Sequence, residues 1–190
     1  MSYDPEYHHR RSIRLMGYDY SQAGFYFVTA NADEKKLLFG KIVDCKMICN
    51  DAGQFVEKCW AEIPTHFPNI ILHEFSILPD HIHGIIEIAD PGINSRTVGV
   101  DEMLSKNAWK NNFLTEGKIK FTSPSKSLGS VIRGFKIGVT KWFKENNTNL
   151  EKVWQRDYFD EIIRDFQAYQ NITNYIKNNP ANWKKNKKSK

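Results

Sequence analysis

Two kinds of hydrophobic pattern alternate along the chain, one typical of β-strands and one typical of α-helices. Aromatic and β-branched residues gather in residues 24–31 and predict a strand, and residues 37–48 form a second extended stretch. Residues 70–78 and 81–88 are two further apolar segments, separated by Pro79-Asp80. Because a Pro-Asp pair favours a turn, these two segments are expected to form a hairpin-like pair of strands.

Three other segments repeat their apolar residues at helical spacing. A helix over residues 51–63 is expected to follow an Asn50-Asp51 cap and to end at Pro64. The apolar stripe of residues 127–146 predicts a long helix. A last helix is expected to begin at Asp165 and to stop near residue 178, before Pro180.

One more strand is expected over residues 152–163, opening at Val153-Trp154 and continuing through Tyr158-Phe159. Strands that interleave with helices in this order indicate an α+β fold, a ferredoxin-like antiparallel sheet with helices packed on one face. Residues 90–126 have no clean period and are rich in Pro, Gly, Asn, Ser and Lys. We expect a long inserted loop there, with one short helical piece near residues 101–112.

Composition adds a basic character to this picture. The 190 residues carry 27 Lys and Arg against 22 Asp and Glu, a net charge of +5, and 13% of them are aromatic. A basic, aromatic-rich small protein has nucleic acid as a reasonable partner. The predicted organisation is a basic extension at residues 1–23, one domain at 24–180 with an insertion at about 89–126, and a Lys-rich tail at 181–190.

Membrane, export and zinc signals are all weak in this sequence. No apolar run approaches the roughly 18 residues that span a bilayer, and the first 14 residues lack the apolar core of a secretory signal. The three cysteines are Cys45, Cys49 and Cys59, whose spacing is not that of a zinc site. We therefore expect a cytoplasmic protein with no membrane partner.

The first candidate for chemistry is the segment Pro79-Asp-His-Ile-His-Gly84. Residues two apart on a strand point to the same face, so His81 and His83 project together while Ile82 points into the core. Two imidazoles on a rigid strand can supply two metal ligands, and Gly84 leaves room for a substrate backbone to approach. The alternative is a pair of ordinary surface histidines, and a metal would require a third ligand.

The second candidate lies on the last predicted helix. Tyr175 and Asn179 are four residues apart and therefore share a helix face. The hydroxyl could act as a nucleophile, and the amide carbonyl could complete the shell of a hard metal beside two imidazoles. The alternatives are a core tyrosine and an asparagine that ends a helix before Pro180.

These segments together resemble the HUH endonuclease superfamily, and within it the single-tyrosine transposases of insertion-sequence type. Domesticated relatives, the REP-associated tyrosine transposases, are the most similar group. The resemblance covers most of the chain through motifs in the same order: Arg10-Arg-Ser-Ile-Arg-Leu, Gly24-Phe-Tyr-Phe-Val-Thr, Leu78-Pro-Asp-His-Ile-His-Gly, Ser127-Leu-Gly-Ser-Val-Ile-Arg-Gly-Phe-Lys, Val153-Trp-Gln-Arg-Asp-Tyr-Phe-Asp-Glu-Ile-Ile-Arg and Tyr175-Ile-Lys-Asn-Asn-Pro-Ala-Asn-Trp183.

The resemblance implies roles for individual residues. His81 and His83 match the metal-binding pair, and Tyr175 matches the nucleophile, with Tyr158 as its rival. Asn179 stands where insertion-sequence enzymes have a metal-binding Gln, which leaves the third ligand open. The other candidates for that ligand are Glu161, where many relatives have His, and Asp160 behind it.

The activity that the resemblance implies is cleavage and rejoining of single-stranded DNA through a 5′-phosphotyrosine, with Mg²⁺ or Mn²⁺ as cofactor. The expected partner is single-stranded or hairpin DNA, and both a homodimer and a monomer are known among such relatives. A non-catalytic single-stranded nucleic-acid-binding module on a ferredoxin-like sheet is the alternative. The residues expected to contact DNA are Arg10, Arg11, Arg14, Arg133, Lys136, Lys177, Lys184 and Lys185. Lys177 is also a candidate to neutralise charge in the transition state.

Overall fold

The structure, a computed structural model, describes residues 18–89, 127–146 and 150–187, with side chains up to residue 183. The strands are β1 (Gly24–Asn31), β2 (Gly40–Val43), β3 (Lys46–Cys49), β4 (Ile70–Leu78), β5 (His81–Ile88) and β6 (Phe159–Ile163). The helices are the short 3-10 helix η1 (Asp33–Lys35), α1 (Asp51–Ala61), α2 (Ile63–His66), α5 (Leu128–Glu145) and α6 (Phe166–Lys187). The insertion at 90–126, with its expected helical piece, lies outside the described residues, as do Arg10, Arg11 and Arg14.

Four strands form one antiparallel sheet in the order β4-β5-β1-β6. Because β5 pairs between β4 and β1, the succession β1-α1-β4-β5-α5-β6 has the split βαβ pattern of a ferredoxin-like fold. The expected α+β class with its antiparallel sheet is therefore confirmed. The two central strands, β1 and β5, pair along their whole length from Gly24↔Ile88 to Asn31↔His81.

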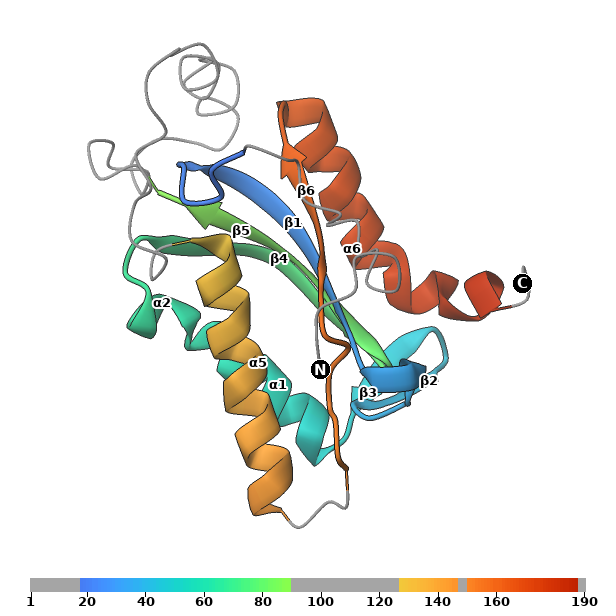
Figure 1. Cartoon of the computed structure of the whole chain (residues 1–190). Coiled ribbons are helices and arrows are strands. Elements are labelled where there is room, and N and C mark those ends of the chain that lie inside the picture. The colour runs from blue at the N-terminus through green and yellow to red at the C-terminus, as the bar shows by residue number, and fades with distance from the viewer. Residues whose placement is uncertain (1–17, 90–126, 147–149, 188–190) are drawn as a thin grey trace, which may run out of the picture.

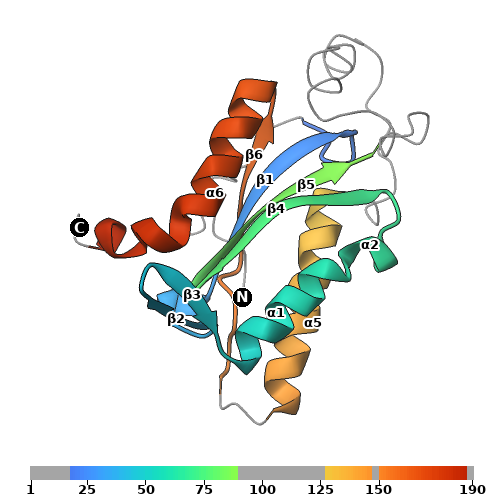
Figure 2. The same cartoon turned by 180° about the vertical axis from the view of Figure 1, so that it is seen from behind.

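Helices cover both faces of this sheet (Figures 1 and 2). Alternate residues of β1 point to opposite faces, so Tyr26, Val28 and Ala30 join the main core with α1 and α5. Phe25 and Phe27 instead form a second core with the apolar residues of α6. The expected packing on one face thus holds for α1 and α5, but it is wrong for the last predicted helix, α6, which covers the opposite face.

Two expected strands differ from the observed ones. Residues 37–48 contain two short strands, β2 and β3, that form their own hairpin. The chain reverses at Asp44 and Cys45, whose φ values of 47° and 62° are the left-handed pair required by a tight hairpin turn. The strand expected from Val153 begins only at Phe159, and Trp154 makes a single bridge to Ala32.

Helix starts follow the expected caps, but two helix ends do not. The first predicted helix, α1, ends at Ala61, and Pro64, its expected stop, lies in the first turn of α2, where a proline is tolerated. The side chain of Asn50 accepts from the Gly53 N–H at 2.9 Å, and that of Asp165 accepts from the Ala168 N–H at 2.7 Å. The predicted stop of the last helix before Pro180 is wrong, because α6 continues to Lys187. A proline inside a helix removes one hydrogen bond and bends the axis, and α6 does change direction in its C-terminal part (Figure 1).

Gly84 has a different role from the one its sequence position suggests. A Cβ there would lie 2.3 Å from Cζ2 of Trp60, on the α1 side of the sheet, so the space beside Gly84 is filled by the indole ring. The glycine therefore admits a core tryptophan, and the expectation that it leaves room for a substrate backbone is wrong.

We predict that Gly84→Ala lowers the free energy of unfolding by about 1–3 kcal/mol, because the added methyl group overpacks the core against Trp60. Urea denaturation followed by circular dichroism measures the change. The control is Gly138→Ala on α5, where the new Cβ would meet Cys59 Sγ at an ordinary 3.5 Å. That variant should keep or slightly raise stability, and equal midpoints for the two variants would contradict the packing argument.

Candidate active site

His81 and His83 lie on β5, a central strand, and face the side of the sheet that α6 covers. Their paired residues on β1 are Asn31, opposite His81, and Thr29, opposite His83. Ile82, between them, is fully buried in the opposite core. The strand alternation expected from the sequence is therefore present, and it places both imidazoles under one helix.

Hydrogen bonds fix the orientation of both rings. His81 Nδ1 lies 2.5 Å from Oδ1 of the buried Asp80, and His83 Nδ1 lies 2.7 Å from the Thr29 hydroxyl. The two Nε2 atoms converge at 3.0 Å. Since an ionised carboxylate only accepts, Asp80 holds the proton of His81 on Nδ1 and leaves a lone pair on Nε2. The Thr29 hydroxyl can accept from Nδ1 of His83 and so favour the same tautomer there.

The surroundings keep His83 uncharged. Burial, with additional contributions from the nearby His81 and Lys35, lowers the pKa of His83 to about 3. The ring also stacks on Phe27, with centroids 5.4 Å apart. A neutral imidazole in an apolar setting has a free lone pair, which is the state that ligates a metal.

Tyr175 meets this pair from α6. Its hydroxyl lies 3.4 Å from His83 Nε2, and its ring stands edge-on to Phe27 at 6.1 Å. The side chain is 48% exposed, while the next residue, Ile176, is completely buried in the second core. The helix is thus anchored through Ile176, and the phenol is left accessible beside the two histidines.

The candidates for a third ligand occupy different places. Asn179 is buried one helical turn beyond Tyr175, and its Nδ2 has no hydrogen-bond partner among the described residues. Glu161 is paired with Phe27 of β1, so it points to the same face as His83, but it lies on β6, with β1 between it and β5. Asp160 is paired with Val28 and therefore points to the opposite face. Asn179 is the candidate that the fold brings onto the helix face of Tyr175.

The rival nucleophile and the expected DNA contacts are scattered. Tyr158 packs against the main core on the side of α5, away from the histidine pair. Arg133 and Lys136 are on α5 and line a groove on that side. Lys177 forms an ion pair with Glu74 at 3.3 Å. Lys184 and Lys185 lie on the last part of α6, beyond the described side chains.

Four residues near the histidines were not expected from the sequence as part of the site. Asp80 was interpreted only as a turn residue, and Thr29 only as a strand residue. Lys35 donates from Nζ to Asn31 Oδ1. Its backbone is left-handed, with φ of 57°, a conformation that residue propensities do not predict for lysine. Trp183 lies 5.4 Å from the His81 ring, a contact that exists because α6 continues past Pro180. The sequence signals were that Asp80 adjoins His81 and that Thr29 and Trp183 end two of the motifs that carry the resemblance.

A second polar cluster attaches α6 to the sheet. His73 Nε2 lies 2.9 Å from Oε2 of the buried Glu87, and the Tyr169 hydroxyl lies 3.1 Å from His73 Nδ1. The register of β4 shifts between Leu72 and Phe75, which marks a β-bulge. Bulges re-aim side chains, and here His73 and Glu74 both reach α6, although consecutive strand residues normally point apart.

Among the residues with described placement, no three His, Cys, Asp or Glu side chains form a group that could hold a metal ion. Among the described residues, the other ligands of a metal at the histidine pair would be amide or hydroxyl oxygens. In the same part of the chain, no helix is both long and apolar enough to cross a membrane.

We predict that His73→Leu lowers the free energy of unfolding by about 3 kcal/mol, because it leaves the Glu87 carboxyl buried without its partner. The double variant His73→Leu/Glu87→Leu should recover part of that loss, since it removes the buried charge as well. Urea denaturation of the wild type, both single variants and the double variant gives the coupling free energy. Strictly additive losses would contradict the interpretation of this pair as one buried unit.

Comparison with known proteins places the chain in a family. No family model matches it. It is 40% identical over 181 residues to an uncharacterized protein of Haemophilus influenzae, and the match spans 95% of this chain and 93% of that protein.

Solved structures give the fold. The chain superposes on a REP-associated tyrosine transposase bound to a REP hairpin with a TM-score of 0.55 and 15% identity, over 90% of this chain and 73% of that one. A proposed transposase of Deinococcus radiodurans matches with a TM-score of 0.44 and 12% identity, over 87% of this chain and 95% of that one. The chain thus belongs to one family with the Haemophilus influenzae protein, and its fold is that of a tyrosine transposase.

Proposed function

We propose that this protein is a metal-dependent single-stranded DNA transposase or endonuclease that acts through a 5′-phosphotyrosine. The observation that carries the proposal is the approach of the Tyr175 hydroxyl to His83 Nε2 at 3.4 Å, with His81 Nε2 3.0 Å beyond. The tyrosine and His83 are 92 positions apart in the chain. Their convergence on one accessible point supports a nucleophile beside a metal-binding pair.

The histidine pair fits a divalent metal of the Mg²⁺ or Mn²⁺ type. Adjacent ligands of an octahedral ion, at metal–ligand distances of about 2.0–2.1 Å, are about 2.9 Å apart, close to the observed 3.0 Å between the two Nε2 atoms. Asp80 and Thr29 supply the outer hydrogen bonds that ligating histidines usually have. Asn179 is our candidate for the third protein ligand. A metal bound there would polarise the non-bridging oxygens of a phosphate.

The proposed reaction is a phosphoryl transfer onto tyrosine. The Tyr175 oxygen forms a bond to phosphorus, the bond from phosphorus to the 3′-oxygen breaks, and the proton lost by the phenol is balanced by one taken up at the leaving 3′-hydroxyl. The protein is then joined to the 5′-phosphate. A covalent intermediate preserves the phosphodiester's free energy, so a second 3′-hydroxyl can reverse the attack and join new ends.

DNA in hairpin form is the substrate that we favour. The structural neighbour with the same fold was solved with a REP hairpin bound, which supports this class of DNA for the present chain. Lys35 is the cation that we propose near the developing charge, because its Nζ donates to Asn31 Oδ1, and Asn31 is the β1 partner of His81. Lys177, the earlier candidate, is already paired with Glu74.

The alternative, a non-catalytic binding module, fits less well. Such modules stack bases on exposed aromatic residues of an open sheet face. Here Phe25 and Phe27 are buried beneath α6, and the opposite face carries α1 and α5. The arrangement around Tyr175 would also have no purpose in a protein that only binds.

We predict that Tyr175→Phe abolishes covalent capture of a cleaved oligonucleotide and leaves binding of the same oligonucleotide unchanged. The measurement is a denaturing gel of protein incubated with Mn²⁺ and single-stranded hairpins taken from DNA that flanks the gene. Tyr158→Phe is the matched control and should still form the adduct. An adduct that persists in Tyr175→Phe and disappears in Tyr158→Phe would identify Tyr158, on the α5 side, as the nucleophile instead.

We predict further that His81→Ala removes Mn²⁺ binding and that Asp80→Asn weakens it by about 10- to 100-fold, because Asp80 orients the ligating imidazole. Isothermal titration calorimetry with Mn²⁺ alone measures both effects without any assay of activity. His66→Ala, at an exposed histidine on α2, is the control and should bind as the wild type does. Unchanged Mn²⁺ affinity in His81→Ala would refute the metal site.

A further inference from the structure

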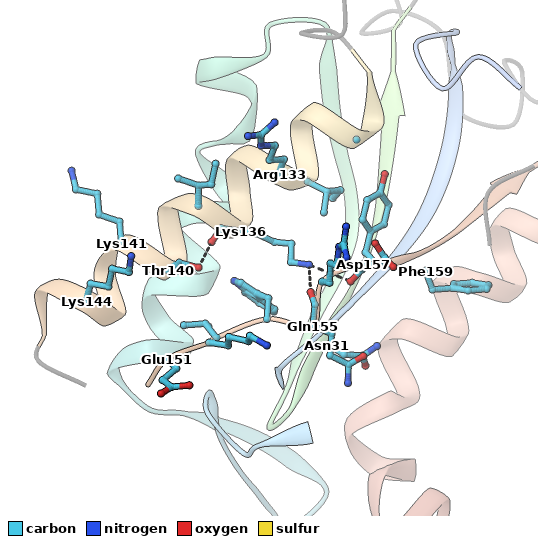
Figure 3. Close-up of a pocket in the computed structure, with 18 residues that line it drawn as sticks. Asn31, Arg133, Lys136, Thr140, Lys141, Lys144, Glu151, Gln155, Asp157 and Phe159 are labelled. Carbon is cyan, nitrogen blue, oxygen red and sulfur yellow. Dashed lines mark hydrogen bonds between the residues drawn. The ribbon is translucent and has the colours of Figure 1, made fainter. Parts of the chain in front are cut away.

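A basic groove runs along the side of the protein opposite to α6. It lies between α5 and the segment of residues 151–159, and it encloses about 1220 Å³ (Figure 3). Six basic side chains line it, against the two acidic residues Glu151 and Asp157. The basic residues are Arg133, Lys136, Lys141, Lys144, Lys152 and Arg156.

The charges of the groove are arranged along a line. From Arg133 to Lys144, α5 advances three turns, about 16 Å at 1.5 Å per residue. Both of these side chains are exposed. A row of cations on this scale matches several consecutive phosphates of one nucleic-acid strand and is longer than a single small anion requires.

Lys136 has a different role from its neighbours. Its Nζ donates to the backbone carbonyls of Gln155 at 2.6 Å and Asp157 at 3.2 Å, as Figure 3 shows. Burial lowers the pKa of Lys136 to about 8, against the opposing effect of Asp157. Lys136 therefore braces the wall of the groove. Of the other five cations, Lys141 forms an ion pair with Glu145 at 3.6 Å, and the exposed remainder are Arg133, Lys144, Lys152 and Arg156.

Apolar side chains are also accessible along the groove. Ile137, 56% exposed, lies on its α5 wall, and Phe159, 39% exposed, lies at its β6 end, with its ring on the α6 face of the sheet beside Phe27. Exposed aromatic surface beside a row of cations suits a strand whose bases are unpaired, because every base has a face that can stack. A duplex keeps its bases stacked inside and would leave these side chains unused.

One end of the groove reaches the candidate active site. Asn31 and Phe159 line that end. Asn31 is the β1 partner of His81, and Phe159 is the β6 partner of Thr29, which bonds His83. The Phe159 ring also lies 6.3 Å from Phe27, the residue stacked on His83. Since β6 is the edge strand of the sheet, a ligand can pass from the α5 side around this edge to Tyr175.

We propose that the groove binds the backbone of single-stranded DNA and guides that strand over Phe159 to Tyr175. This inference rests on the proposed function, which it extends by a defined path for the substrate on the protein. The strand's phosphates contact the exposed cations of α5 and of residues 152–156, and its bases face the apolar lining. The path leaves the strand's scissile phosphate at the histidine pair.

The test compares two double variants with the same loss of charge. Arg133→Ala/Lys144→Ala removes two groove cations, and Lys58→Ala/Arg164→Ala removes two exposed cations outside the groove lining. Binding of a fluorescein-labelled oligothymidylate is followed by fluorescence anisotropy in EDTA over a range of salt. Because each lost contact with single-stranded phosphate removes about 0.7 from the salt slope, the groove variant should lose about 1.4, or about 25-fold in affinity near 0.1 M salt.

The control variant should bind nearly as the wild type does. Equal losses of affinity in the two variants would refute the proposal that the groove binds single-stranded DNA. Tighter binding of a duplex of the same length through the same cations would also refute it. Binding in EDTA is independent of cleavage. If the wild type forms the covalent adduct and the groove variant binds normally, the groove is not the DNA-binding surface, while the proposed function stands. If no adduct forms and the groove variant still loses binding, the proposed function fails and the groove remains a single-strand surface.

Discussion

The packing of α6 on the β1–β5 face is the constraint on which the candidate site depends. The central strands fix the position of the histidine pair. Tyr175, 92 positions after His83, reaches that pair only if α6 packs on the sheet at a defined angle and distance. Two kinds of contact set that placement. Ile176 and the apolar residues near it enter the second core, and Tyr169 and Lys177 reach consecutive residues of β4 across a bulge. The free energy for positioning Tyr175 thus comes from residues that take no part in its chemistry.

The two faces of the sheet have different roles. The face toward α1 and α5 holds the larger core, including Trp60, which occupies the space beside Gly84. The face toward α6 holds the smaller core and the polar residues of the candidate site. Strand alternation makes this division possible, because Ile82 can stabilise one face while His81 and His83 serve the other. The basic groove on the α5 side then meets the α6 face at the edge strand β6.

Much of the fold follows from local pattern, and the site follows only in part. Alternation in β1 and β5, the helical stripe of α5 and the caps at Asn50 and Asp165 are local properties, and the structure has them as expected. The end of α6 was mispredicted because Pro180 is unfavourable locally, whereas the Trp183–His81 contact that accompanies the longer helix is tertiary. The turn at Asp44-Cys45 and the backbone of Lys35 depend on left-handed conformations, which are rare for Cys and Lys and cannot be predicted from the residue type. The approach of Tyr175 to His83 could be suspected only from the family resemblance, since no spacing rule links residues on a strand and a distant helix.

The central claim is that the phenol oxygen of Tyr175 forms the covalent bond to the DNA phosphate. Mass spectrometry of the peptide left attached to DNA, after the protein has reacted with hairpin DNA and Mn²⁺ and been digested, measures this most directly. The account predicts a nucleotide on Tyr175, within the segment that follows Arg164 and ends at Lys177, with Tyr169 of the same segment unmodified. A nucleotide on Tyr158, or on Tyr169, would contradict it.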